Sequence, residues 1–132
     1  MKKKSLLMMM LMALCVPWAA HAQQELTVHE GTTTNNFVPV YGYYADAYLK
    51  CEMVYPADEL VEMNGAEISG MTFYASQESV NWGTDFQVFL VEVADATISD
   101  FNGPGTVVYE GALAITGNQM TFEFSTPYTY GG

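Results

Sequence analysis

The chain has little cysteine and, after its first 22 residues, almost no positive charge. Its 132 residues include two cysteines and four lysines and arginines, against 15 acidic residues. Three of the four basic residues open the sequence, so the part after residue 22 holds one lysine, Lys50, and 15 − 1 = 14 net negative charges. Such a chain cannot neutralise phosphate groups, which excludes binding to nucleic acid and to anionic lipid surfaces.

Long apolar runs are also scarce, since only one occurs. The run LLMMMLMALCVPW follows three lysines and precedes AAHA, the arrangement of a secretory signal peptide over residues 1–22. We predict cleavage between Ala22 and Gln23 and a protein that is secreted or held on the outer cell surface. Acylation of Cys15 as a lipoprotein is less favoured, because Leu14 stands where a small residue is needed. No later run reaches the roughly 18 residues of a membrane span, so we expect no membrane insertion of the mature chain.

Removal of the signal would leave Cys51 as the only cysteine, so no disulfide within the mature chain is possible. In the segment YLKCEMVY, alternate side chains share a face if the segment is a strand. Cys51 then lies on the apolar face, together with Leu49, Met53 and Tyr55. We therefore expect an unreactive thiol that is buried in the core.

The spacing of apolar residues after the signal has a period of two, which is typical of β-strands. MTFEFS and ISGMTFYA place apolar side chains at every second position. TDFQVFLVEVA is apolar on both faces, which indicates a strand covered on both sides or a strand with a bulge. VVYEGALAIT is a further strand, or a pair of strands broken at Gly111. PADELVEM is the one helical piece, a single turn opened by Pro56.

Turn signals separate these runs. Asn64-Gly65 and Gly117-Asn118 are expected to form tight hairpin turns, and Asn81-Trp82-Gly83 is expected to form another turn. Short strands with frequent turns predict an all-β fold, an antiparallel, jelly-roll-like β-sandwich over residues 23–132. Because STPYTYGG follows a strong strand directly, we expect the module to be truncated and to lack its last strand or strands.

Several segments together resemble a β-sandwich module of exported proteins in Bacteroidetes. They are GTTTNNFVPVYGYYADAYLKCEMVYPADEL, NGAEISGMTFYAS, DFQVFLVEV, VVYEGALAIT and MTFEFSTPYTYGG. The match falls on Pro39, Tyr43–Tyr44, Tyr55, Ala57–Leu60, Ile68–Phe73 and Pro127–Gly131. The family's serine and glutamine are replaced around Ala47 and Cys51, and its closing strand is missing. The resemblance implies the N-terminal portion of a non-catalytic, adhesin-like module that accompanies other domains, and it implies no defined binding residues.

No catalytic motif is present in the sequence. P-loop, GxGxxG, HExxH and CxxC patterns are all missing, and His29 has no nucleophile at a recognisable spacing. We therefore expect that the protein is not an enzyme. A calcium site is the one cofactor that the residues allow, because DATISDFNG offers oxygen ligands from Asp95, Asp100 and Asn102. Aspartates that serve turns in a solvated loop are the simpler interpretation.

The remaining candidates for function are aromatic residues that could stack on a sugar or a peptide. Trp82 stands in SVNWGT, a loop-like context, and Tyr43 and Tyr44 belong to the tyrosine-rich segment YGYYADAY. The simpler interpretation is that most of these rings cover the sheet, since tyrosine suits half-buried strands, and Trp82 is then the better ligand candidate. We predict an accessory or adhesion module that binds a glycan or a host protein. The alternative is a purely structural spacer or assembly domain of a larger surface protein or secreted hydrolase.

Overall fold

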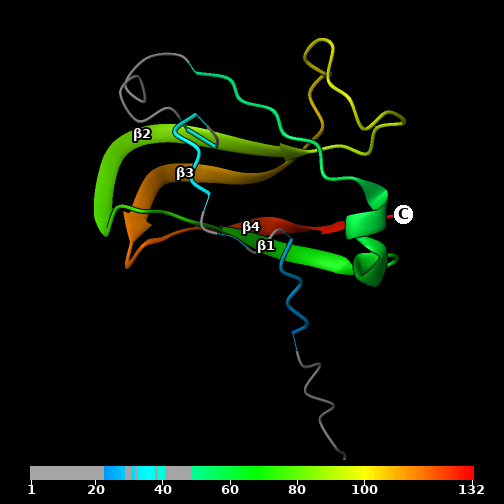
Figure 1. Cartoon of the computed structure of the whole chain (residues 1–132), viewed down its shortest axis with the longest axis horizontal. Helices are drawn as coiled ribbons and strands as arrows, with labels where there is room; N and C mark the ends of the chain where they lie inside the picture. Colours follow the sequence, from blue (N-terminus) through cyan, green and yellow to red (C-terminus); the bar gives the residue numbers. More distant parts are fainter. Residues whose placement is uncertain (1–22, 29–30, 32, 38, 41–48) are drawn as a thin grey trace, which may run out of the picture.

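The computed structural model describes residues 23–28, 31, 33–37, 39–40 and 49–132, and the backbone alone at Trp82 and Thr84 (Figure 1). The fold of this part is all-β and antiparallel, as the sequence predicts. None of its helices is long and apolar enough to cross a membrane. The elements are the 3-10 helices η2 (Ala57–Glu59) and η3 (Val61–Met63), followed by the strands β1 (Glu67–Tyr74), β2 (Ser79–Leu90), β3 (Thr106–Thr116) and β4 (Gln119–Thr129).

The four strands form one long two-stranded ribbon that is folded over at its middle. β1 pairs with β4, and β2 pairs with β3, whereas β3 and β4 pair only at Thr116 and Gln119. Residues 67–90 therefore run antiparallel to residues 106–129 along the whole ribbon. Figure 1 shows the β1–β4 half below the β2–β3 half, with both connections between the halves at the left. The fold-over brings one face of each half together, which produces the sandwich-like arrangement.

The fold-over depends on the tight turn at Gly117-Asn118. Both residues have left-handed backbone angles, with φ of 56° and 62°, which is typical of a two-residue hairpin turn. The Ala75 N–H donates to the Asn118 carbonyl at 2.8 Å, and the Asn118 N–H donates to the Glu78 carbonyl at 3.1 Å. These bonds hold the β1–β2 connection beside the β3–β4 turn. The prediction of a hairpin at this position is confirmed.

The second predicted hairpin, at Asn64-Gly65, is wrong. Gly65 does have a left-handed φ of 74°, but its turn leads from the helix η3 into β1. The Gly65 N–H donates to the Tyr130 carbonyl at 2.9 Å, so the turn bonds to the residue that follows β4. The preceding segment cannot be a strand because Pro56 opens two 3-10 turns there, in agreement with the predicted helical turn.

Phe122 of β4 lies at the centre of the core and is only 2% exposed. Its ring stacks on Phe86 of β2, with 5.6 Å between ring centroids. It also meets two rings edge-on, Tyr109 of β3 at 5.1 Å and Phe73 of β1 at 6.2 Å. One ring thus joins both halves of the ribbon, an arrangement that stabilises aromatic clusters beyond the area they bury. The other buried apolar residues are Val108, Leu113, Ile115, Met120 and Tyr130.

The sequence predicts local irregularities in two of the strands. For TDFQVFLVEVA the sequence predicts either a strand covered on both sides or a bulge, and the bulge does not lie at the apolar centre of this segment, because the register shift between Val88 and Phe89 leaves the extra residue, Val108, in β3. Of the two alternatives for VVYEGALAIT, the single strand is confirmed and the pair broken at Gly111 is wrong, because β3 runs through this glycine without interruption. The Tyr109 side chain lies over this glycine, and its hydroxyl donates to the Ala112 carbonyl at 2.7 Å. The tyrosine ring therefore covers the surface that the glycine leaves bare.

Candidate functional site

The two halves of the ribbon separate on one side and leave an open cleft of about 1120 Å³. β3 lies next to β4, whereas β1 and β2 lie apart, so the cleft opens between β1 and β2. The segment 49–57 forms a further wall of the cleft. We call the innermost apolar side chains the floor of the cleft; they are Met71, Phe73, Phe86, Val88 and Phe122.

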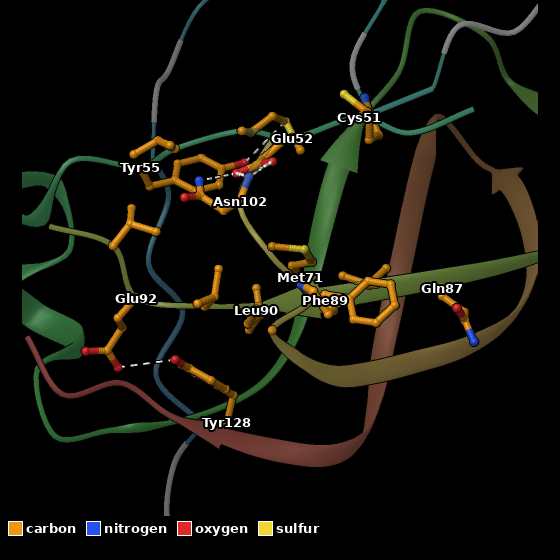
Figure 2. Close-up of a pocket in the computed structure, with 18 of the residues that line it drawn as sticks. Cys51, Glu52, Tyr55, Met71, Gln87, Phe89, Leu90, Glu92, Asn102 and Tyr128 are labelled. Atoms are coloured by element: carbon orange, nitrogen blue, oxygen red, sulfur yellow. Dashed lines mark hydrogen bonds between the residues drawn. The ribbon is translucent and has the colours of Figure 1, made fainter. Parts of the chain in front are cut away.

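Large apolar side chains beside this floor remain exposed. Phe89 and Val91, at the end of β2 and just after it, are 42% and 50% exposed, and both line the cleft (Figure 2). Phe89 is exposed because it alternates with the half-buried Val88 and Leu90 along β2; the extra residue at the nearby register shift is Val108 of β3. An apolar surface of this kind is stabilised when a partner removes it from water, by about 25 cal/mol per Å².

Charge around the cleft is strongly asymmetric. We call the carboxylates that line it the acidic rim; they are Glu52, Asp85, Glu92, Asp95 and Glu110. Lys50 is the one basic side chain lining the cleft in the described part of the chain. Its ammonium group already lies over the Phe101 ring, 4.4 Å from the ring centroid. The cleft therefore suits a ligand that carries positive charge beside apolar groups.

Hydrogen bonds tie the wall of the cleft to the loop between β2 and β3. The Glu52 carboxylate accepts the Asn102 backbone N–H, at 3.0 Å, and also the side-chain amide of the same residue (Figure 2). Hydrogen bonds to a carboxylate are stronger than those between neutral groups. This contact, together with that of Lys50 and Phe101, holds the segment 49–55 against the loop 91–105.

A second acidic residue ties the start of the same loop to the end of β4 and to Gly131 after it. One oxygen of the Glu92 carboxylate accepts the Gly131 N–H at 2.8 Å and the Tyr128 hydroxyl at 3.3 Å (Figure 2). Burial and the Glu92 carboxylate raise the pKa of Tyr128 above its ordinary value of 10.0. A tyrosinate next to this carboxylate would place two negative charges together.

This contact predicts a loss of stability at alkaline pH. Because the pKa of Tyr128 is raised in the folded state, its stabilising effect is present below about pH 10 and is lost as the pH rises further. Between pH 9 and pH 11 we expect the unfolding midpoint of the native protein in urea to fall more than that of Tyr128→Phe. Tyr74→Phe is the control, since Tyr74 is 68% exposed. Equal losses in all three proteins would contradict the prediction.

The structure does not assemble the predicted calcium ligands into one group. Asp95 lines the cleft, the Asp100 carboxylate accepts the Phe101 N–H at 2.8 Å, and Asn102 bonds to Glu52. Among the described residues, no three His, Cys, Asp or Glu side chains gather where they could hold a metal ion. The calcium site therefore stays a prediction, and Asn102 has a structural role that the sequence did not indicate.

Some of the aromatic residues predicted to bind a ligand lie outside the described residues. Tyr43 and Tyr44 lie outside the described residues, and so does the side chain of Trp82. The backbone at Trp82 belongs to β2, so the predicted turn at Asn81-Trp82-Gly83 is wrong. Asn81 and Gly83 instead form a local irregularity within the strand. Gly83 has a left-handed φ of 59°, and its N–H donates to the Asn81 side chain at 2.8 Å.

Cys51 is not buried in the core, contrary to the prediction. The segment around it is not a strand, and its side chain is half-buried and lines the cleft (Figure 2). The alternation of YLKCEMVY is real, but Leu49 and Tyr55 on the same face also remain exposed. Burial raises the pKa of the Cys51 thiol, which lowers the fraction of reactive thiolate.

Sequence reasoning missed the residues that define the cleft. Phe89, Glu52 and Glu92 appear in the sequence as ordinary parts of strands and loops. One signal was present, because TDFQVFLVEVA has more apolar residues than one buried face can use. An excess of this kind indicates either a second covered face or a surface for a partner.

Comparison with known proteins gives no assignment for this arrangement. No family model, no curated protein and no solved structure matches the chain. The resemblance to a Bacteroidetes surface module therefore stays a prediction. What is established is an all-β antiparallel chain whose folded ribbon carries an acidic, apolar-floored cleft.

Proposed function

We propose that the chain is a non-catalytic binding module of a secreted or cell-surface protein and that the cleft is its ligand site. The observation that carries the proposal is the set of half-exposed apolar side chains beside the floor, including Phe89 and Val91. Contiguous apolar surface with a polar rim is typical of interaction sites. The predicted signal peptide and the resemblance to adhesin-like modules support a role in adhesion, with a glycan or a protein as ligand.

A structural spacer or assembly domain is the second candidate. The observation that favours it is that exposed apolar side chains also lie away from the cleft, with Val61 66% and Tyr74 68% exposed. Surfaces of this kind can pack against a neighbouring domain of the same protein. The two candidates differ in whether the isolated protein binds a soluble ligand through the cleft.

The test is a binding panel of oligosaccharides and of peptides from extracellular proteins, applied to the exported protein and two variants. Phe89→Ala removes a half-exposed ring from the cleft, and Tyr74→Ala removes an exposed ring elsewhere. Truncation of an aromatic at the centre of a binding site costs about 2 kcal/mol or more. We expect ligand affinity to fall at least tenfold in Phe89→Ala and to stay unchanged in Tyr74→Ala. Failure of every ligand to bind the native protein would favour the spacer.

A further inference from the structure

We infer that the ligand of the cleft is an extended polypeptide segment with alternating apolar and basic side chains, which adds as a strand to the outer edge of β2. The inference rests on the proposed function and names the class of its ligand.

Within the described part of the chain, β2 pairs only with β3, and β1 pairs only with β4. The second edges of β1 and β2 border the cleft, which opens between these two strands. An edge strand presents backbone N–H and C=O groups that a further strand can pair with, and this is a common mode of peptide recognition.

The two faces of β2 predict the pattern of side chains in the added strand. Phe86 and Val88 are half-buried and pack against the core, whereas Asp85 and Gln87, which alternate with them, are exposed. A strand that pairs with β2 continues both faces, because successive side chains of a strand alternate between the two sides of the sheet. One set of its side chains would lie over the apolar floor, and the other set would lie on the outer face beside Asp85.

The outer face of this half carries one exposed carboxylate on each strand, Asp85 of β2 and Glu110 of β3. Gln87 lies directly opposite Glu110 in the β2–β3 register, and its side-chain amide donates to the Glu110 carboxylate. Asp85 is one step further along the same face of β2. Lysine or arginine at the outward positions of the ligand is attracted by these carboxylates, whereas acidic residues are repelled.

The same charge argues against a second copy of this chain as the occupant. Two chains that each carry 15 − 1 = 14 net negative charges after residue 22 repel each other at low ionic strength. The structure therefore favours a partner of opposite charge. A neutral glycan carries no positive charge for the acidic rim to attract and cannot form a strand ladder with the edge of β2.

The first experiment measures binding of a ten-residue peptide that alternates valine and lysine, by fluorescence anisotropy with the exported protein. The controls are a valine–glutamate peptide and a valine–lysine peptide with N-methyl groups on alternate residues, which cannot complete a strand ladder. We expect the valine–lysine peptide to bind at least tenfold more tightly than either control. Its affinity should fall at least tenfold when salt is raised from 50 to 500 mM. Equal affinity for the N-methylated peptide would overturn strand addition.

The second experiment uses two double variants that remove the same charge. Asp85→Asn with Glu110→Gln changes the outer face at the cleft, and Glu67→Gln with Glu123→Gln changes exposed acids that do not line it. We expect the first pair to weaken the valine–lysine peptide at least fivefold and the second pair less than twofold. Equal weakening by both pairs would overturn the inference, because net charge alone would then explain binding.

The outcomes separate this inference from the proposed function. If no valine–lysine peptide binds but an oligosaccharide binds in a manner that Phe89→Ala abolishes, the polypeptide ligand is wrong and the cleft remains a binding site. If neither peptides nor oligosaccharides bind the native protein, both proposals fail.

Discussion

Phe122→Ala is expected to lose about 3–5 kcal/mol of unfolding free energy, the range measured when a buried phenylalanine is truncated to alanine. The Phe122 ring is 2% exposed and contacts aromatic rings from the other three strands, so its removal leaves a cavity between the two halves of the ribbon. A domain of this size has only about 5–15 kcal/mol of stability. Urea denaturation followed by circular dichroism should show a large shift of the midpoint.

Phe89→Ala is the control for this experiment. It removes the same ring from the same sandwich, but at a position that is 42% exposed. We expect a loss of about 1 kcal/mol or less, because little packed surface disappears. A result in which both variants lose the same stability would show that Phe122 does not join the two halves.

Gly70→Ala is expected to destabilise the protein by about 1–3 kcal/mol, the usual cost of forcing an extra group into a packed structure. A Cβ at this position would stand 2.8 Å from the Phe122 carbonyl oxygen, which belongs to the backbone of β4. The β1–β4 register shifts between Ile68 and Gly70, so the two backbones already approach closely at an irregular point. The methyl group can be accommodated only if β1 and β4 move apart.

Gly103→Ala is the matched control for Gly70→Ala. A Cβ at Gly103 would meet no atom within 4 Å, so we expect a change of no more than about 0.5 kcal/mol in either direction. Thermal and urea unfolding of the two variants should therefore separate clearly. A loss at Gly103 as large as that at Gly70 would mean that the lost freedom of the chain, and not contact with β4, determines the effect.

The local parts of this fold could be predicted from the sequence. The alternation in MTFEFS and ISGMTFYA placed Phe122 and Phe73 on the core face, since a period of two is a property of each strand by itself. The turn at Gly117-Asn118 was predictable for the same reason, because its left-handed residues act over two positions. The helical turn after Pro56 also depends on adjacent residues only.

The cleft could not be predicted in this way, because it arises from the separation of strands that are distant in sequence. Nothing local to β1 or β2 indicates that they lie apart while β3 and β4 meet. At Asn81-Trp82-Gly83 the local signal was misleading. These residues favour a turn in isolation, but β2 pairs with β3 on both sides of them, and this pairing keeps them within the strand. Leu49 and Cys51 alternate as a strand would, yet no described strand pairs with them.

The fold-over of the ribbon also determines the order in which the strands can meet during synthesis. β1 is synthesised first, but its partner is β4. Glu67 can therefore pair with Thr129 only after β2 and β3 have been synthesised. β2 and β3 can pair sooner, because the paired residues Leu90 and Thr106 are separated by a shorter segment of chain. Until β4 emerges, β1 has no partner strand, and Phe73 lacks its contact with the Phe122 ring. The nascent chain is thus at greatest risk of aggregation through the same strand that forms one side of the mature cleft.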